Sequence, residues 1–85
     1  MARLRATNLK PTKETFIFYP NPASNYLTIE NPNLQTRLII CNIIGELIFE
    51  TVIDKNSLQI DLGNFLPGIY IIRVGDSESY KLVKL

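Results

Sequence analysis

Histidine and tryptophan are absent from the 85 residues of this chain, and cysteine occurs once, as Cys41. Without histidine, the chain lacks the usual general base of a serine or cysteine triad and the commonest zinc ligand. A single thiol can form neither an internal disulfide nor a thiolate metal site. We expect Cys41 to be buried and unreactive, because its sequence neighbours are apolar. The chain is therefore predicted to need no metal and no cofactor.

Long apolar runs are also missing. No stretch approaches the roughly 18 uninterrupted apolar residues that a membrane-spanning helix requires, so no membrane span is predicted. The segment Met1 to Lys13 has the basic start of a secretory signal peptide but not the apolar block that must follow it. If this domain is exported, we expect the N-terminal signal to lie elsewhere.

Clustered acids and clustered glycines are lacking as well. The carboxylates are dispersed over predicted strand ends and turns, whereas glycoside cleavage needs two acids in one cleft. Neither Asp54 with Asn56 nor Asp76 with Glu78 has the ligand spacing of a calcium loop. The four glycines are isolated, so no phosphate-binding loop is predicted. We predict that the chain has no catalytic residues and is not an enzyme.

The charge is small and unevenly placed. The net charge is +1, and four of the nine basic residues, Arg3, Arg5, Lys10 and Lys13, precede the first acid, Glu14. From there onward five basic and eight acidic residues remain, a net charge of −3. A mildly acidic body argues against a nucleic-acid partner.

The length allows one domain with one core. Residues 1–14 show neither strand nor helix periodicity, and Pro11 interrupts any helix there. We expect a flexible lead-in or linker over residues 1–14 and a folded domain over residues 15–85.

The body consists of short β-branched and aromatic runs separated by Pro, Gly, Asn and Asp. Nothing between them has helical periodicity or the length of a crossover that a parallel sheet needs. The pattern predicts an all-β antiparallel sandwich of about seven strands. The predicted strands are Thr15–Tyr19, Tyr26–Glu30, Thr36–Cys41, Glu46–Ile53, Leu58–Leu62, Ile69–Val74 and Ser79–Leu85.

Two prolines shape the first connection. In Tyr19-Pro20-Asn21-Pro22 each proline fixes its own φ, favours extended geometry in the residue before it, and cannot donate to a strand ladder. The segment is predicted to leave one strand as a rigid extended corner and to lead into the next.

A hairpin is predicted at Asn42-Ile43-Ile44-Gly45, which fits a type I turn followed by a left-handed glycine. Counting outward from this turn, the expected cross-strand pairs are Cys41 with Leu47, Ile40 with Ile48, and Ile39 with Phe49.

Both faces of this hairpin are apolar. One carries Leu38, Ile40 and Ile48, and the other carries Ile39, Cys41, Leu47 and Phe49. Only one face can line the main core, so the other needs a loop, the lead-in or another molecule to cover it. Cover from within the chain is favoured, and Ile39, Leu47 and Phe49 form a possible partner surface.

Four groups of motif residues follow one another along the chain. They are Tyr19, Pro20, Asn21, Pro22 and Ala23; Asn42 and Gly45; Gly68 and Tyr70; and Lys81, Leu82, Val83 and Lys84. In this order, the groups resemble the type A C-terminal sorting domains of type IX secretion substrates. The resemblance spans Phe18 to Leu85. The family pattern favours Leu38, Ile40 and Ile48 as the core face of the hairpin.

The resemblance implies an immunoglobulin-like sandwich at the end of a larger secreted or surface protein that passes through the periplasm of a Gram-negative bacterium. Such a domain directs its N-terminal passenger across the outer membrane, where a sortase-like protease typically removes it. The implied partners are the outer-membrane secretion machinery, that protease and the passenger. The cut is expected ahead of Phe16. Recognition is expected to be by shape and by a strand edge or an apolar face, and the last strand, Ser79–Leu85, is the natural candidate.

A second reading is a carbohydrate-binding or adhesive sandwich of an extracellular protein. With no tryptophan, its sugar platform would need exposed tyrosines, and the candidates are Tyr19, Tyr26, Tyr70 and Tyr80. A third reading is a purely structural spacer domain. The sequence leaves the identity of the passenger and the oligomeric state open.

Overall fold

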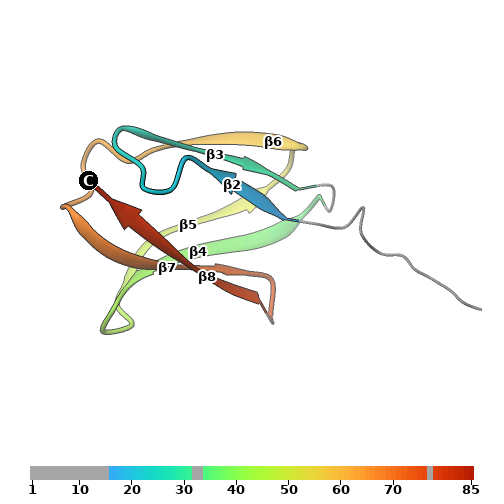
Figure 1. Ribbon diagram of the computed structural model, residues 1–85. Coiled ribbons are helices and arrows are strands. Elements are labelled where there is room, and N and C mark those ends of the chain that lie inside the picture. The colour runs from blue at the N-terminus through green and yellow to red at the C-terminus, as the bar shows by residue number, and fades with distance from the viewer. Residues whose placement is uncertain (1–15, 32–33, 77) are drawn as a thin grey trace, which may run out of the picture.

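The computed structural model describes residues 16–31, 34–76 and 78–85 (Figure 1), so the predicted lead-in over residues 1–14 lies outside the described residues. The described part contains seven strands and no helix, which confirms the predicted all-β class. The strands are β2 (Ile17–Tyr19), β3 (Tyr26–Glu30), β4 (Thr36–Asn42), β5 (Leu47–Ile53), β6 (Ser57–Asp61), β7 (Gly68–Val74) and β8 (Glu78–Lys84).

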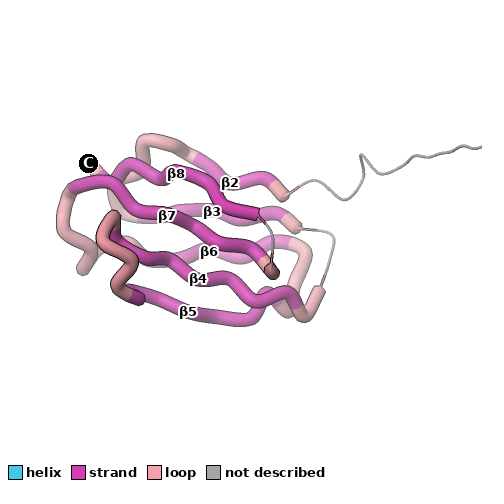
Figure 2. The backbone as a smooth tube through the Cα atoms, turned by 90° about the horizontal axis from the view of Figure 1, so that it is seen from below, coloured by secondary structure: helices cyan, strands magenta, loops and turns pink. Residues whose placement is uncertain are grey.

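The strands form two antiparallel sheets that pack as a sandwich. One sheet has the order β2-β3-β6 and the other the order β5-β4-β7-β8. Figure 2 views the molecule from the side of the four-stranded sheet, with the three-stranded sheet behind it. The chain passes between the sheets at the β3–β4, β5–β6 and β6–β7 connections. β2 begins at one end of the sandwich, and the C-terminus lies at the other (Figure 1).

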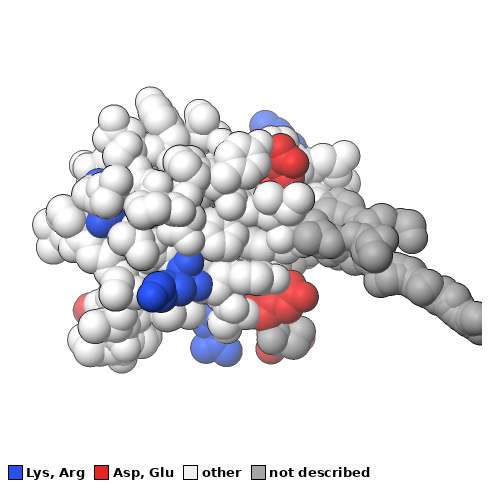
Figure 3. Space-filling view, in the orientation of Figure 1, with Lys and Arg blue, Asp and Glu red and all other residues white. Residues whose placement is uncertain are grey.

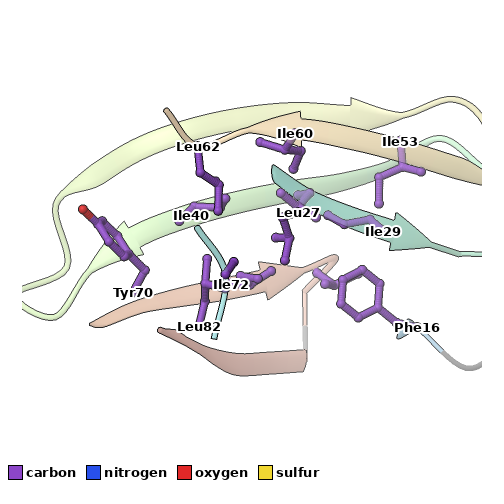
Figure 4. Close-up of a cluster of buried hydrophobic side chains, with 13 residues drawn as sticks. Phe16, Leu27, Ile29, Ile40, Ile53, Ile60, Leu62, Tyr70, Ile72 and Leu82 are labelled. Carbon is purple, nitrogen blue, oxygen red and sulfur yellow. The ribbon is translucent and has the colours of Figure 1, made fainter. Parts of the chain in front are cut away.

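The core fills the space between the sheets because inward residues alternate with outward ones along each strand. Figure 4 shows side chains from both layers converging there. Those that are completely buried and large are all Leu or Ile. They are Leu27, Ile29, Leu38, Ile40, Ile53, Leu62, Ile72 and Leu82. Each contributes about 1.5–3 kcal/mol by leaving water, so the sandwich is held by packing without any cross-link.

The turn between β4 and β5 has the predicted geometry. The Gly45 amide donates to the Asn42 carbonyl at 3.0 Å, and Gly45 has φ +91°. The Asn42 side chain organises the rest of the turn, since its Oδ1 accepts from the amides of Ile44 (3.1 Å) and Glu46 (2.9 Å). Its Nδ2 donates to the Glu46 carboxylate at 2.8 Å.

The predicted register of the hairpin holds only next to the turn. Cys41 faces Leu47 as expected, but a β-bulge between Ile40 and Cys41 then shifts the pairing by one residue. Ile40 therefore faces Phe49, and Phe49 packs against the core.

The predictions that depended on this register fail with it. The assignment of Phe49 to a partner surface was wrong, and so was the placement of Ile48 in the core, because Ile48 is exposed. Cys41, which we expected to be buried because its sequence neighbours are apolar, is only half-buried, on the outer face, although its pairing with Leu47 is the expected one.

Candidate functional site

The proline-rich corner lies against the last strand, β8. The Asn21 Nδ2 donates to the Lys81 carbonyl at 3.0 Å, and the Val83 amide donates to the Asn21 Oδ1, also at 3.0 Å. Two residues later, at Ala23, the hydrogen bonds to β8 are made by the backbone. The Ala23 amide donates to the Val83 carbonyl at 2.8 Å, and the Leu85 amide donates to the Ala23 carbonyl at 2.8 Å.

The Asn21 side chain thus acts as a peptide group in a strand ladder, and Ala23 continues that ladder in the parallel direction. Together they pair four backbone groups on the outer edge of β8, from Lys81 to Leu85. A partner strand cannot pair with these groups while the corner is in place. The second half of the strand that we expected to be recognised is therefore already paired along its outer edge within the chain.

Motif residues that are far apart in sequence form two rows across the sheet. In the first row Ala23 bridges Lys84, and Lys84 faces Gly68 on β7. In the second row Asn42 faces Tyr70, and Tyr70 faces Leu82. Ala23 and Leu82 are completely buried. The two rows thus hold β8 along both of its edges, Ala23 along one and β7 along the other.

Tyr70 closes one end of the sandwich. Its side chain is buried, and its hydroxyl donates to the Leu66 carbonyl at 2.6 Å. The ring meets Phe65 edge to face, with centroids 5.3 Å apart. Gly68, two residues before Tyr70, has φ +150°, a conformation that L side chains rarely adopt. The Gly-x-Tyr motif is therefore a packing unit.

Three aromatic rings, none of them part of the motifs, pack between the start of the domain and β8. Phe16 stacks on Tyr80 at 5.2 Å between centroids, and Phe18 meets Tyr80 edge to face at 5.7 Å. Burial and the nearby Glu78 carboxylate raise the pKa of Tyr80. A signal for this contact was present in the sequence, since Phe16 and Phe18 alternate on one face of a predicted strand.

Tyr19 and Tyr26 are exposed on the outer face of the three-stranded sheet. The Tyr19 hydroxyl donates to the Glu30 carboxylate at 2.5 Å, and this hydrogen bond raises the pKa of Tyr19. Tyr70 and Tyr80 are used in packing, so the four tyrosines do not form one platform for a sugar.

Two of the three residues predicted to form a possible partner surface lie on one outer face. Ile39 and Leu47 lie on the outer face of the four-stranded sheet. Leu47 faces Cys41, and Ile39 lies two residues before Cys41 on β4 and therefore on the same face. Phe49 lies on the opposite face, against the core.

The described residues contain no cluster of three or more potential metal ligands. Among the same residues, no helix is long and apolar enough to cross a membrane.

A comparison with protein families matches residues 17–85, which include all seven strands, to the model described as the secretion system C-terminal sorting domain. The chain belongs to this family. The sorting domain is a C-terminal secretion signal and is not itself a catalytic unit.

Two curated relatives carry a similar segment. One is the β-agarase A of Zobellia galactanivorans, 29% identical over 75 residues, which covers 86% of this chain and 14% of the relative. The other is the ulvan lyase NLR42 of Nonlabens ulvanivorans, 36% identical over 67 residues, covering 74% of this chain and 12% of the relative. This sorting domain thus spans only a small part of the relatives that it matches.

A solved structure shares the fold. It belongs to PorZ, a surface component of the type IX secretion system of Porphyromonas gingivalis, and matches with a TM-score of 0.74 at 19% identity. The match covers 87% of this chain and 12% of that one. It confirms the sandwich fold of the sorting domain.

Proposed function

We propose that this sorting domain directs a larger N-terminal cargo across the outer membrane through the type IX secretion system. The observation that carries the proposal is the family match over residues 17–85, which takes in all seven strands. The cargo is then released from the cell or held at its surface.

The proposed cargo is a separate N-terminal unit that carries its own activity. The two curated relatives are named for different reactions, an agarase and an ulvan lyase, and share with this chain a segment of 14% or less of their length. Such a pattern is expected of a signal that is combined with unrelated activities. The C-terminus lies at the far end of the sandwich from the start of β2 (Figure 1), so an N-terminal cargo leaves the end of β8 unobstructed.

We also propose that a sortase-like protease removes the domain by cutting ahead of Phe16. Phe16 is buried and stacks on Tyr80, so the backbone from this residue onward belongs to the packed body. Proteases act on accessible, extended backbone. Sequencing the N-terminus of the released tail tests this point, and a cut after Phe16 would contradict it.

Deletion of the last strand tests the main proposal. A cargo that ends in this chain should remain inside the cell when Lys81 to Leu85 are removed, because these residues contribute the buried Leu82 and the paired edge. The same cargo with Asn25→Ala, an exposed side chain in the corner after Ala23, should be exported normally. Export of the truncated cargo at the level of the intact one would contradict the proposal.

A further inference from the structure

The two outer faces of the sandwich differ in polarity. An exposed sheet face normally carries polar side chains, and the three-stranded sheet largely follows this rule. All the outward residues of its β6, Ser57, Gln59 and Asp61, are polar. The four-stranded sheet does not follow it, because apolar side chains lie on the outer face of every one of its strands.

We define this outer face by the alternation of the four strands. Its apolar members are Ile39, Cys41, Leu47, Val52, Ile69, Ile71 and Val83, and its charged members are Arg37, Glu50, Arg73 and Lys81. No described residue buries the face, since Leu47, Val52 and Ile69 are each about half exposed. The expectation that a loop covers the second apolar face does not hold for the described loops.

The charges on this face are not balanced. Arg37 forms an ion pair with Glu50. Among the described residues, Arg73 and Lys81 have no acidic partner. They are close to each other, because Arg73 faces Ser79 and Lys81 faces Ile71 on the neighbouring strand. Figure 3 shows basic side chains along the lower side of the molecule, with acidic side chains further along the same side. The face is therefore apolar with a net charge of +2, on a body whose net charge is negative.

We propose that this face docks on a protein whose apolar surface carries carboxylates placed to meet Arg73 and Lys81. The inference rests on the proposed export function, for which it names the contact surface. Apolar contact supplies the affinity of such an interface, and charge complementarity supplies register and selectivity.

Three other occupants fit the charges or the composition less well. Two copies stacked by this face would bring like charges together, which costs free energy. The lead-in carries four cations and no acid before Glu14, so it is repelled by the same two side chains. A lipid surface favours tryptophan and tyrosine at its interface, and no aromatic side chain lies on this face.

Matched substitutions in a cargo that ends in this chain test the proposal. Ile69 is 45% exposed on the docking face, and Ile17 is 46% exposed on the opposite outer face. Ile69→Asn should lower the amount of exported cargo about tenfold, whereas Ile17→Asn should leave it within about twofold of the unchanged chain.

A charge pair gives a second, independent readout. The double variant Arg73→Gln/Lys81→Gln changes the net charge by −2, and so does the double variant Ser57→Glu/Gln59→Glu on the opposite face. Only the first should reduce export. Urea unfolding of the four purified chains should give similar midpoints, because all the replaced side chains are exposed.

Equal export of the docking-face variants and their controls would overturn the docking surface. The other occupants are tested on the purified chain. If the chain forms a dimer at micromolar concentration, and the Arg73 and Lys81 substitutions change the dimer's stability, the face belongs to a second copy. If the chain floats with anionic phosphatidylglycerol vesicles, the face belongs to lipid. Faster labelling of Cys41 by a maleimide after removal of residues 1–14 would assign it to the lead-in. If a cargo whose tail lacks Lys81–Leu85 is still exported, the proposed export function itself fails. If that cargo is retained but cargo with the docking-face substitutions is exported normally, the function stands and the docking surface fails.

Discussion

Asn21 pairs with β8 through its side chain, whereas Ala23, two residues later, pairs through its backbone. The reason lies in the prolines on both sides. Pro20 and Pro22 have no amide hydrogen, so the corner can donate few backbone hydrogen bonds of its own. The carboxamide of Asn21 has one donor group and one acceptor, and it replaces the missing peptide. The sequence predicted a rigid corner here, but not its partner, because that partner is 60 residues away.

Replacement of Asn21 should weaken the fold measurably. Asn21→Ala leaves the Lys81 carbonyl and the Val83 amide without their protein partner, so the free energy of unfolding should fall by about 1–3 kcal/mol. Urea denaturation of the purified chain measures the change. Asn25→Ala is the matched control and should cost less than about 0.5 kcal/mol, because surface substitutions are usually small. Equal effects of the two variants would contradict the role given to Asn21.

Tyr80 should make the domain sensitive to alkaline pH. Its pKa is raised above the ordinary 10.0, first by burial and then by Glu78. The folded state thus holds the phenolic proton more tightly than the unfolded chain does. This contribution to stability is complete below pH 10 and is lost as the pH rises through the pKa of the folded state.

We therefore expect the urea midpoint of the unchanged chain to fall more steeply than that of Tyr80→Phe as the pH rises above about 10. Urea midpoints of both chains, measured from below to above about pH 10, test this expectation. Parallel pH profiles for the two chains would show that Tyr80 does not carry the effect.

Among the elements, β8 is the strand whose edge is protected by sequence-distant residues. Edge strands expose unpaired amides that can recruit other chains, and here the corner pairs the amides of Val83 and Leu85. The motif residues thus serve the last strand structurally. Their assignment as a site for a partner stays a prediction.

Hydrogen exchange can test this protection directly. The Val83 amide should exchange slowly in the unchanged chain and at least tenfold faster in Asn21→Ala, because its acceptor has been removed. The Leu85 amide, which donates to the Ala23 backbone, should change less. Equal acceleration at every amide would instead indicate global unfolding.

The seven strands were predictable because each is a short run that contains β-branched, aromatic or leucine side chains and is bounded by turn residues. Their observed ends differ from the predicted ones by at most two residues where both are described. The turn at Asn42 and Gly45 was predictable for the same local reason. The bulge between Ile40 and Cys41 was not, because the alternation of side chains along the two strands does not mark the position of an extra residue.

At the scale of the whole molecule, the chain presents a sandwich without a metal-ligand cluster in its described part, one polar outer face and one apolar outer face. The family could be predicted because its motifs occur in order along the chain, and the match over residues 17–85 confirms it. The docking face could be predicted only in part. Ile39 and Leu47 were found from their hairpin, but Ile69, Ile71 and Val83 join them only through the pairing of β4, β7 and β8.

Transfer of the domain to a foreign protein tests the central claim most directly. A reporter that has a signal peptide for the periplasm is joined to residues 1–85 and expressed in a bacterium with a type IX secretion system. We predict that the reporter appears in the medium or on the cell surface, and that it stays in the periplasm without the domain. Retention of the fused reporter in the periplasm, with the domain folded, would contradict the account.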